Sequence, residues 1–335
     1  MAIKSIELKN FTVFENIKCE FSPGINILIG ENGTGKTHLL KVLFAVAKGE
    51  YKVNEGETEY HHTNWSSLLE RYFRNKGYLS LHRNANNKIP YSISAECDTQ
   101  KFCFTSDDHF LASYAGRDFA VLIPAKDMLT HARGLLTMAK KYSQDMPFDK
   151  TLLNIIEKAE EWKINEMQAP MKDVTMSLKN VIGGEIIQEN GDFFTVKNDG
   201  SKIPFALEAE GIKKLGLLWL LIMNGNLSAG KTLFWDEPES NINPKLIPVV
   251  VDVLMELARN GVQVFLATHE YNLMKYFSVK NKDSDLVSFI SLHKTDNGVA
   301  CEVEEDYTLL ENNSIVDAGI KLLEDEIEGV LGHAN

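Results

Sequence analysis

The stretch Leu233-Phe234-Trp235-Asp236-Glu237-Pro238-Glu239-Ser240-Asn241 joins an apolar run to two adjacent carboxylates and a proline. The residues from Thr232 to Trp235 predict a buried strand, and Pro238 ends it because proline cannot donate a hydrogen bond to a sheet. Such a strand delivers both acids to one edge of a sheet. There Asp236 can hold Mg²⁺ and Glu237 can polarise a water molecule. A helix cap or a solvated turn is the alternative explanation of the acid pair.

A phosphate-binding motif lies nearer the N-terminus, at Gly30-Glu31-Asn32-Gly33-Thr34-Gly35-Lys36-Thr37, and fits the pattern G-x-x-x-x-G-K-[ST]. Its glycines allow backbone N–H groups to surround phosphates, and the helix that follows directs its positive end at them. Lys36 is predicted to reach the β- and γ-phosphates, and the Thr37 hydroxyl to bind Mg²⁺. A chance glycine turn is disfavoured because an apolar strand precedes the loop and a helix follows it. The sequence therefore predicts ATP and Mg²⁺ as ligands, with Thr37 and Asp236 at the metal.

The composition is that of a globular protein, with 335 residues, 44% apolar and 24% charged. The longest uncharged apolar run, Leu215–Met223, is far shorter than the roughly 18 residues of a membrane span. The N-terminus lacks a signal-peptide profile, and the four cysteines lack metal-ligand spacing, so we expect a cytoplasmic protein with reduced thiols. A net charge of −12 disfavours broad nucleic-acid binding, although a local basic stripe remains compatible with it.

Residues 1–228 alternate between strand and helix patterns. Apolar–polar alternation predicts strands at 3–11, 14–21 and 25–29, then a helix at 38–46. Short antiparallel strands are predicted at 78–82, 91–95 and 101–105, followed by a strand at 119–123. From 125 to 181 the pattern is helical, with Asp149 as a helix cap; short strands follow at 185–203 and an apolar helix at 211–223.

After residue 230, strands and helices alternate. Strands are predicted at 232–236, 262–267, 286–292 and 298–303, with helices at 245–260, 270–280 and from Ser314 onward. This order predicts a mostly parallel sheet with helices on both faces. We expect residues 1–124 and 229–335 to form a nucleotide-binding lobe, and residues 125–228 to form a helical lobe.

His269 follows the strand Val262–Ala267, at the edge of the sheet where Asp236 and Glu237 are expected. A lone histidine is more often structural. Its place at this strand end instead predicts that His269 hydrogen-bonds the γ-phosphate and holds the water that Glu237 polarises.

The order of these motifs resembles the ABC-type ATPases: a phosphate loop, Asp236-Glu237, Ser240-Asn241-Ile242-Asn243, and a strand ending in His269. The opening Ile6–Phe11 is similar to the structural-maintenance-of-chromosomes (SMC) and RecF branch. The segments Ala209–Gly216 and Trp235–Glu239 resemble compact bacterial AAA-domain ATPases related to the heads of overcoming-lysogenization-defect nucleases. The resemblance implies an α/β P-loop NTPase, an ABC-ATPase head with a mostly parallel core sheet, an antiparallel β subdomain and a helical lobe.

The resemblance also implies a homodimer with two ATP molecules between its subunits. Asn241 would lie in the D-loop that crosses to the partner, and Gly211 in the signature motif that faces the partner's γ-phosphate. Gly211 opens an apolar helix, whose N-terminus favours anions.

Departures from the family pattern predict a slow ATPase. Ala209 replaces the usual signature serine, and Glu208 and Glu210 bring negative charge that Lys213 or Lys214 would have to compensate. Thr12 replaces a basic residue that often follows the N-terminal Asn-Phe, and Lys126-Asp127 occupies the place of the glutamine loop.

The functional expectation is an ATP-dependent switch that controls a separately encoded effector or nuclease, and the resemblance implies a role in bacterial anti-phage defence. A RecF-like repair ATPase that binds DNA is the alternative, and a transporter motor is disfavoured by the N-terminal pattern and the signature. Trp65, Trp162 and Trp219 are expected in the core, and His61-His62 in a polar loop.

Overall fold

The computed structural model describes most of the chain. The described residues are 2–48, 63–74, 81–83, 89–98, 100–107, 110–112, 119–142, 148–164, 166–167, 169–282 and 284–332. The predicted polar loop at His61 and His62 lies outside them, as does most of the strand predicted at 78–82.

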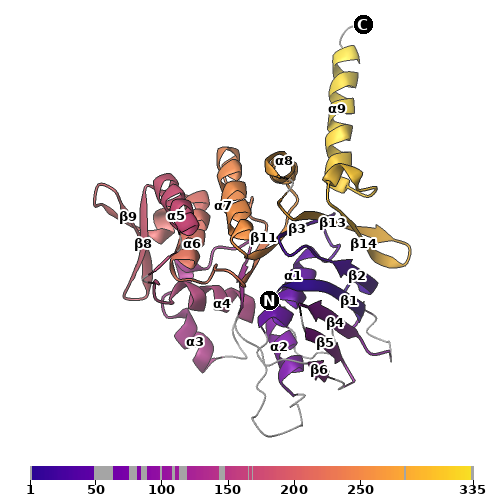
Figure 1. Cartoon of the computed structure of the whole chain (residues 1–335), viewed down its shortest axis with the longest axis horizontal. Helices are drawn as coiled ribbons and strands as arrows, with labels where there is room; N and C mark the ends of the chain where they lie inside the picture. The colour runs from indigo at the N-terminus through magenta and orange to yellow at the C-terminus, as the bar shows by residue number, and fades with distance from the viewer. Residues whose placement is uncertain are drawn as a thin grey trace.

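The central element is a six-stranded sheet in the order β14-β13-β3-β12-β11-β7 (Figure 1). Its strands are β3 (Ile25–Ile29), β7 (Ala120–Ile123), β11 (Thr232–Asp236), β12 (Gln263–Ala267), β13 (Val287–Thr295) and β14 (Gly298–Glu304). All pairs are parallel except β13 with β14. Every side chain of β3 and β12 is buried, as expected for parallel strands that are covered on both faces. The predicted mostly parallel sheet is confirmed.

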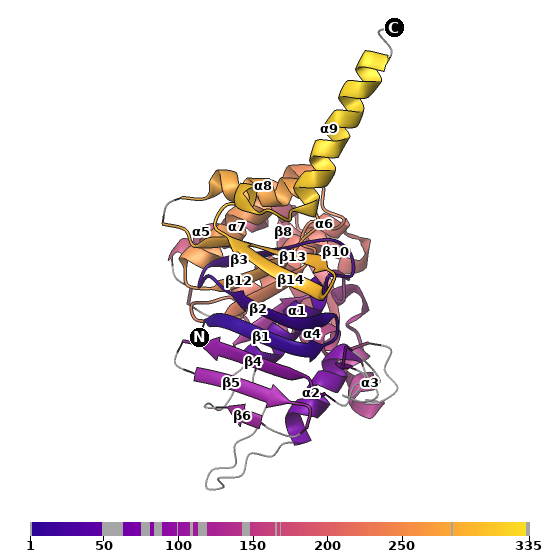
Figure 2. The ribbon, with the colours of Figure 1, turned by 90° about the vertical axis from the view of Figure 1, so that its right-hand side faces the viewer.

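A second, antiparallel sheet lies beside the first in the order β2-β1-β4-β5-β6 (Figure 2). Its strands are β1 (Ile3–Phe11), β2 (Phe14–Glu20), β4 (Ser92–Cys97), β5 (Gln100–Thr105) and β6 (Phe110–Ala112). Helix α1 (Lys36–Lys48) and helix α2 (Thr63–Phe73) share one apolar core with this sheet and with one face of the parallel sheet. The antiparallel β subdomain is therefore present, although His82 contributes only an isolated bridge to Phe11.

The opposite face of the parallel sheet is covered by helices. They are α3 (Leu135–Lys141), α4 (Lys150–Ala159), α5 (Ala169–Ile182), α6 (Glu210–Met223), α7 (Ile247–Arg259) and α8 (Tyr271–Lys280). A small antiparallel sheet of β8 (Gly184–Glu189), β9 (Asp192–Lys197) and β10 (Lys202–Pro204) lies among them. Ile123, Leu218 and Trp235 belong to one continuous core, so the segment 125–228 packs directly on the sheet. We retain the division into two lobes as a proposal.

Three predictions about local structure can be compared with the helices. Asp149 caps α4 by accepting hydrogen bonds from the backbone N–H groups of Thr151 and Leu152, as expected. Trp65 and Trp219 are buried, but Trp162 is 94% exposed, so its assignment to the core was wrong. The apolar face of α4 ends at Ala159, where the helix stops, and Trp162 lies beyond that end on the surface.

The last helix, α9 (Ser314–Gly332), projects away from the rest of the molecule (Figures 1 and 2). In its first turn, Ile315 and Val316 pack against the core. Among the described residues, no helix combines the length and the apolar character that crossing a membrane requires.

Candidate nucleotide-binding site

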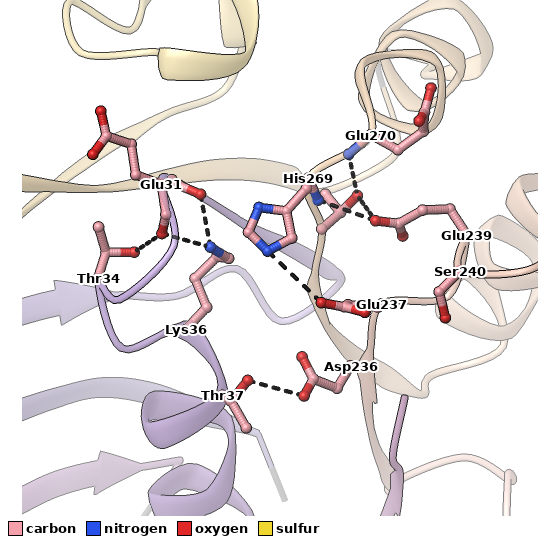
Figure 3. Close-up of polar contacts among 12 residues, drawn as sticks. Glu31, Thr34, Lys36, Thr37, Asp236, Glu237, Glu239, Ser240, His269 and Glu270 are labelled. Atoms are coloured by element: carbon pink, nitrogen blue, oxygen red, sulfur yellow. Dashed lines mark hydrogen bonds and ion pairs between the residues drawn. The ribbon is translucent and has the colours of Figure 1, made fainter. Parts of the chain in front are cut away.

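The predicted site residues come together where three neighbouring parallel strands end. Strand β3 leads into the phosphate loop and α1, β11 ends at Asp236, and the segment after β12 carries His269. Figure 3 shows side chains from these three segments directed toward one another. Ligands of open parallel sheets bind beyond the carboxyl ends of the strands, which is the edge occupied here.

The shape of the phosphate loop depends on its glycines. Gly30 has a φ of +144°, and a Cβ atom there would lie 2.2 Å from the Leu292 carbonyl oxygen. Gly35 has a φ of +89°, and its Cβ would lie 2.5 Å from the Val13 side chain and 2.7 Å from the Phe14 ring. The tip of the β1–β2 hairpin is thus packed against the loop, and only glycine fits between them.

The other loop positions are held by local contacts. The Thr34 hydroxyl donates to the Glu31 carbonyl oxygen at 2.9 Å, and the Glu31 carboxylate pairs with Lys294 at 3.3 Å. Asn32 and Gly33 are exposed. The loop backbone therefore holds its shape through its own side chains and leaves its tip open.

Lys36 is buried and directed back into the loop. Its Nζ donates to the carbonyl oxygens of Gly30 at 2.7 Å and Glu31 at 3.0 Å. Burial lowers the pKa of Lys36 to about 8, although Asp236 and Glu237 oppose the shift. A cation that is poorly solvated gains more from an incoming anion, so this lysine is suited to a phosphate.

Thr37 and Asp236, predicted to bind Mg²⁺, are direct neighbours. The Thr37 hydroxyl donates to Asp236 Oδ2 at 2.9 Å, across 199 positions of sequence. Burial raises the pKa of Asp236, while the hydrogen bond from Thr37 acts against that rise. Among the described residues, no group of three His, Cys, Asp or Glu side chains could hold a metal ion. One hydroxyl and one carboxylate nevertheless fit Mg²⁺, which keeps waters and phosphate oxygens as its other ligands.

Glu237 and His269 face each other across the site. His269 Nε2 lies 3.8 Å from Glu237 Oε1 (Figure 3). Burial lowers the pKa of His269, and the charge of Lys36 lowers it further. The imidazole is therefore neutral at pH 7 and can form a hydrogen bond with a phosphate or a water molecule. Glu237 itself has a φ of +49°, a conformation that costs free energy and is common at functional sites.

Glu239 contributes a contact that sequence reasoning missed. Its Oε1 accepts from the Thr268 hydroxyl at 2.8 Å and from the His269 backbone N–H at 3.0 Å. Burial raises its pKa above the ordinary range. Glu239 thus fixes the segment that carries His269. The sequence showed that Glu239 lies two residues after Glu237, which could have indicated a role in the site. No local pattern could show that its carboxylate accepts a hydrogen bond from the backbone of His269.

Gly211 and Asn241, the predicted signature and D-loop residues, lie side by side. A Cβ at Gly211 would lie 3.6 Å from Ile242 Cα and 3.9 Å from the Asn241 carbonyl oxygen. Gly211 is buried by this contact, whereas its neighbour Ala209 at the N-cap of α6 is exposed. Asn241 is exposed with a φ of +59°.

The acidic residues around the signature are neutralised within the chain. Glu208 pairs with Lys197 at 2.6 Å, and Glu210 pairs with Lys213 at 2.8 Å. Lys213 also lies 3.5 Å from Asp127, which connects the segment after β7 to α6. Lys213 therefore compensates Glu210 as expected, whereas Glu208 is compensated by Lys197, which the sequence did not indicate.

Lys214 instead reaches the carboxylate-bearing loop. Its buried Nζ donates to the Glu237 carbonyl oxygen at 2.8 Å and to the Ser240 hydroxyl at 2.6 Å. Burial lowers the pKa of Lys214 to about 8, with Glu239 and Glu237 opposing. One side chain of α6 thus ties the signature helix to the backbone of Glu237.

Residues 25–275 match the model of the family described as "AAA domain, putative AbiEii toxin, Type IV TA system". The chain belongs to this family. This match confirms the AAA-domain part of the resemblance seen in the sequence.

Two relatives among the curated proteins are both named "DNA replication and repair protein RecF". The chain is 51% identical to the protein of Lachnoclostridium phytofermentans over 47 residues, which are 14% of this chain and 13% of that protein. It is 27% identical to the protein of Bacillus mycoides over 130 residues, which are 38% of this chain and 32% of that protein. The AAA-domain chain therefore matches about a third or less of the length of these relatives.

A solved structure described as an SMC head bound to the C-winged helix domain of ScpA has a similar fold. It aligns with a TM-score of 0.59 and 13% identity, covering 92% of this chain and 99% of the other. The predicted fold class, a P-loop ATPase head with a parallel-rich sheet, is confirmed by this likeness.

Proposed function

We propose that this AAA-domain protein binds and hydrolyses ATP and acts as a switch. The observation that carries the proposal is the convergence of Lys36, Thr37, Asp236, Glu237 and His269 at one sheet edge. The segment of Lys36 and Thr37 lies 199 positions before that of Asp236 and Glu237, and His269 follows in a third segment. Together they supply a cation, two metal ligands, a carboxylate base and a neutral imidazole. ATP hydrolysis needs that set of groups.

In the proposed reaction, loop N–H groups and Lys36 bind the phosphates of ATP. Thr37 and Asp236 would hold Mg²⁺, which would supply charge neutralisation for the phosphates when bound. Glu237 orients a water molecule and takes its proton as the water oxygen attacks the γ-phosphorus. The bond to the β-phosphate oxygen breaks, and ADP and phosphate leave. His269 donates a hydrogen bond to the γ-phosphate and so favours the in-line position of the water.

We further propose that two copies close around two ATP molecules. Asn241 is exposed and lies beside Gly211, two residues after the exposed N-cap Ala209, so both exposed residues could meet a nucleotide that is bound to a second copy. A two-fold dimer then makes two equivalent sites. The closed dimer would control a separately encoded effector or nuclease, and a role in anti-phage defence rests on family resemblance alone.

Mixing two inactive variants tests the shared site. Lys36→Ala removes the phosphate contact, and Ala209→Asp adds a negative charge where the partner's phosphate would dock. Aspartate also caps helices well, so Ala209→Asp should preserve α6. We expect neither variant to hydrolyse ATP alone and the mixture to regain phosphate release, because a mixed dimer holds one intact site. Ala209→Ser, an uncharged cap, is the matched control and should stay active. If the mixture stays inactive while Ala209→Ser works, the two sites are not shared.

Lys214→Met is expected to lower kcat about tenfold while leaving KM nearly unchanged. The substitution removes the donor to the Glu237 carbonyl and the Ser240 hydroxyl, so Glu237 loses its fixed position but Lys36 keeps its contacts. Steady-state phosphate release measures both constants. Lys214→Arg, which retains a cationic donor, should recover part of the rate. An unchanged kcat in Lys214→Met would remove Lys214 from the role of a positioning residue.

The affinity for ATP should fall as the pH rises above 8. Lys36 has a pKa of about 8 without nucleotide, and a bound triphosphate raises it because the charged form gains an anion. ATP binding therefore takes up a proton above pH 8, and affinity drops by up to about tenfold per pH unit. Below pH 7 Lys36 is already charged and this dependence disappears. Calorimetry in two buffers of different ionisation enthalpy measures the proton uptake. Lys214→Met should keep the proton uptake, since Lys214 contacts Glu237 and Ser240 and not the phosphate loop. Loss of proton uptake in Lys214→Met would assign the titration to Lys214 instead.

A RecF-like DNA-binding role is the second candidate, favoured by the two relatives that carry the RecF name. Stimulation of phosphate release by duplex DNA at physiological salt would support it. An ATPase rate that is independent of added DNA would favour the switch for a protein effector.

A further inference from the structure

Helix α9 carries an apolar stripe that is exposed in the part of the chain that the structure describes. Ile320 is 51% exposed, and Leu323 and Ile327 are each 59% exposed. Spacings of three and four residues place these three on one face of the helix; Leu322, which precedes Leu323, is 60% exposed and faces a different side. We call Ile320, Leu323 and Ile327 the α9 seam.

The seam is unusual for this chain. Four of the fifteen large apolar side chains that are exposed among the described residues lie between 320 and 327. Figures 1 and 2 both show α9 leaving the body, with no strand beside its outer part. A single helix of 19 residues is only marginally stable in water, and grouped exposed apolar residues typically mark an interface.

The charges around the seam indicate what can cover it. Helix α9 carries five acidic residues and one lysine: Asp317, Glu324, Asp325, Glu326, Glu328 and Lys321. Two copies of α9 packed through the seam would bring acid against acid, which disfavours self-pairing. Anionic lipid headgroups would repel the same residues. A basic partner would gain both apolar burial and charge attraction.

We propose that α9 is a docking helix for a basic amphipathic helix on a different protein. The partner helix would place apolar residues against the α9 seam and lysine or arginine beside Glu324 and Glu326. The docking of a basic helix does not depend on the proposed function. Only the identification of that partner with the effector rests on it. The partner is thus defined by its chemistry, an apolar stripe flanked by positive charge.

Two synthetic peptides test the proposal with the full chain. Both contain about three heptads with leucine at the positions that would face the α9 seam. The flanking positions are lysine in one peptide and glutamate in the other. We expect the lysine peptide to bind in fluorescence anisotropy and the glutamate peptide not to bind. Replacing Ile320, Leu323 and Ile327 together by serine should weaken binding of the lysine peptide more than about tenfold. Unchanged binding in that variant would overturn the proposal, because attraction to acidic charge alone would then suffice.

Charge reversal gives the second arm. The variant Glu324→Lys with Glu326→Lys should lose the lysine peptide and gain the glutamate peptide; failure to switch would contradict a paired-helix geometry. Sedimentation without nucleotide would overturn the proposal if the seam-to-serine variant converts a wild-type dimer to a monomer. Seam-dependent binding to vesicles of phosphatidylcholine and phosphatidylglycerol would likewise overturn it.

The outcome is separable from that of the proposed function. The seam lies far from the nucleotide-binding residues in sequence and on a separate projection of the fold. Seam-to-serine should therefore keep the wild-type ATPase rate, and Lys36→Ala should keep peptide binding. Loss of peptide binding in Lys36→Ala would mean that docking depends on nucleotide rather than on the seam.

Discussion

Replacing Lys36 by alanine is expected to abolish ATP binding, with a loss of affinity of at least about 100-fold. Lys36 is buried, and its Nζ donates hydrogen bonds to the carbonyl oxygens of Gly30 and Glu31. It therefore already lies inside the loop that would surround the phosphates. Without it, the phosphates lose the ammonium group that offsets the charges of Asp236 and Glu237 from the side of the loop. Calorimetric titration with ATP and Mg²⁺ measures the effect.

Lys294→Ala is the matched control for Lys36→Ala. Lys294 also contacts the phosphate loop, through the Glu31 carboxylate at 3.3 Å, but both side chains are exposed. An exposed ion pair contributes little, so the affinity for ATP should change less than about threefold. Equal losses in the two variants would show that general positive charge, and not the buried Lys36, binds the nucleotide.

Glu237→Gln is expected to bind ATP normally and to lose hydrolysis by about 10²- to 10³-fold. Glutamine retains the size and one oxygen of the side chain but cannot take a proton from water. Since closure would no longer be followed by hydrolysis, ATP should convert this variant to a stable dimer. Single-turnover phosphate release and sedimentation with ATP measure the two effects.

Glu239→Gln is the control that distinguishes a specific role of the Glu237 carboxylate from a general need for negative charge near the site. Glu239 is another partly buried carboxylate near the site, but it accepts hydrogen bonds from Thr268 and from the His269 backbone, and glutamine can still accept them. We expect this variant to lose less than about tenfold in rate. Hydrolysis at the wild-type rate in Glu237→Gln would show that its carboxylate is not the base.

The strands of the parallel sheet could be predicted closely from sequence. The predicted strand 232–236 coincides with β11, and the prediction 262–267 differs from β12 by one residue. Strands buried on both faces are continuous apolar runs, and their ends are marked by proline, glycine or acids. Such signals are local, so they can be recognised in the sequence without knowledge of the fold. The glycines and Lys36 of the phosphate loop belong to the same class.

Trp162 shows where local patterns fail. It continues the apolar spacing of α4, but α4 ends at Ala159, and the side chain lies on the surface. Helical spacing shows which residues share a face only while the helix continues. Where it ends depends on capping and packing around Glu160, which the spacing does not contain.

The sequence by itself predicted a nucleotide-binding site, because the phosphate loop, Asp236-Glu237 and His269 belong to short motifs that can be recognised from neighbouring residues. Three other features depend on segments far apart in the chain: the 2.9 Å contact of Thr37 with Asp236, the hold of Lys214 on the Glu237 backbone, and that of Glu239 on His269. The exposure of the α9 seam likewise follows from how the last helix leaves the core. Long-range contacts are selected by the packing of whole sheets and helices, and that packing is visible only in the folded molecule.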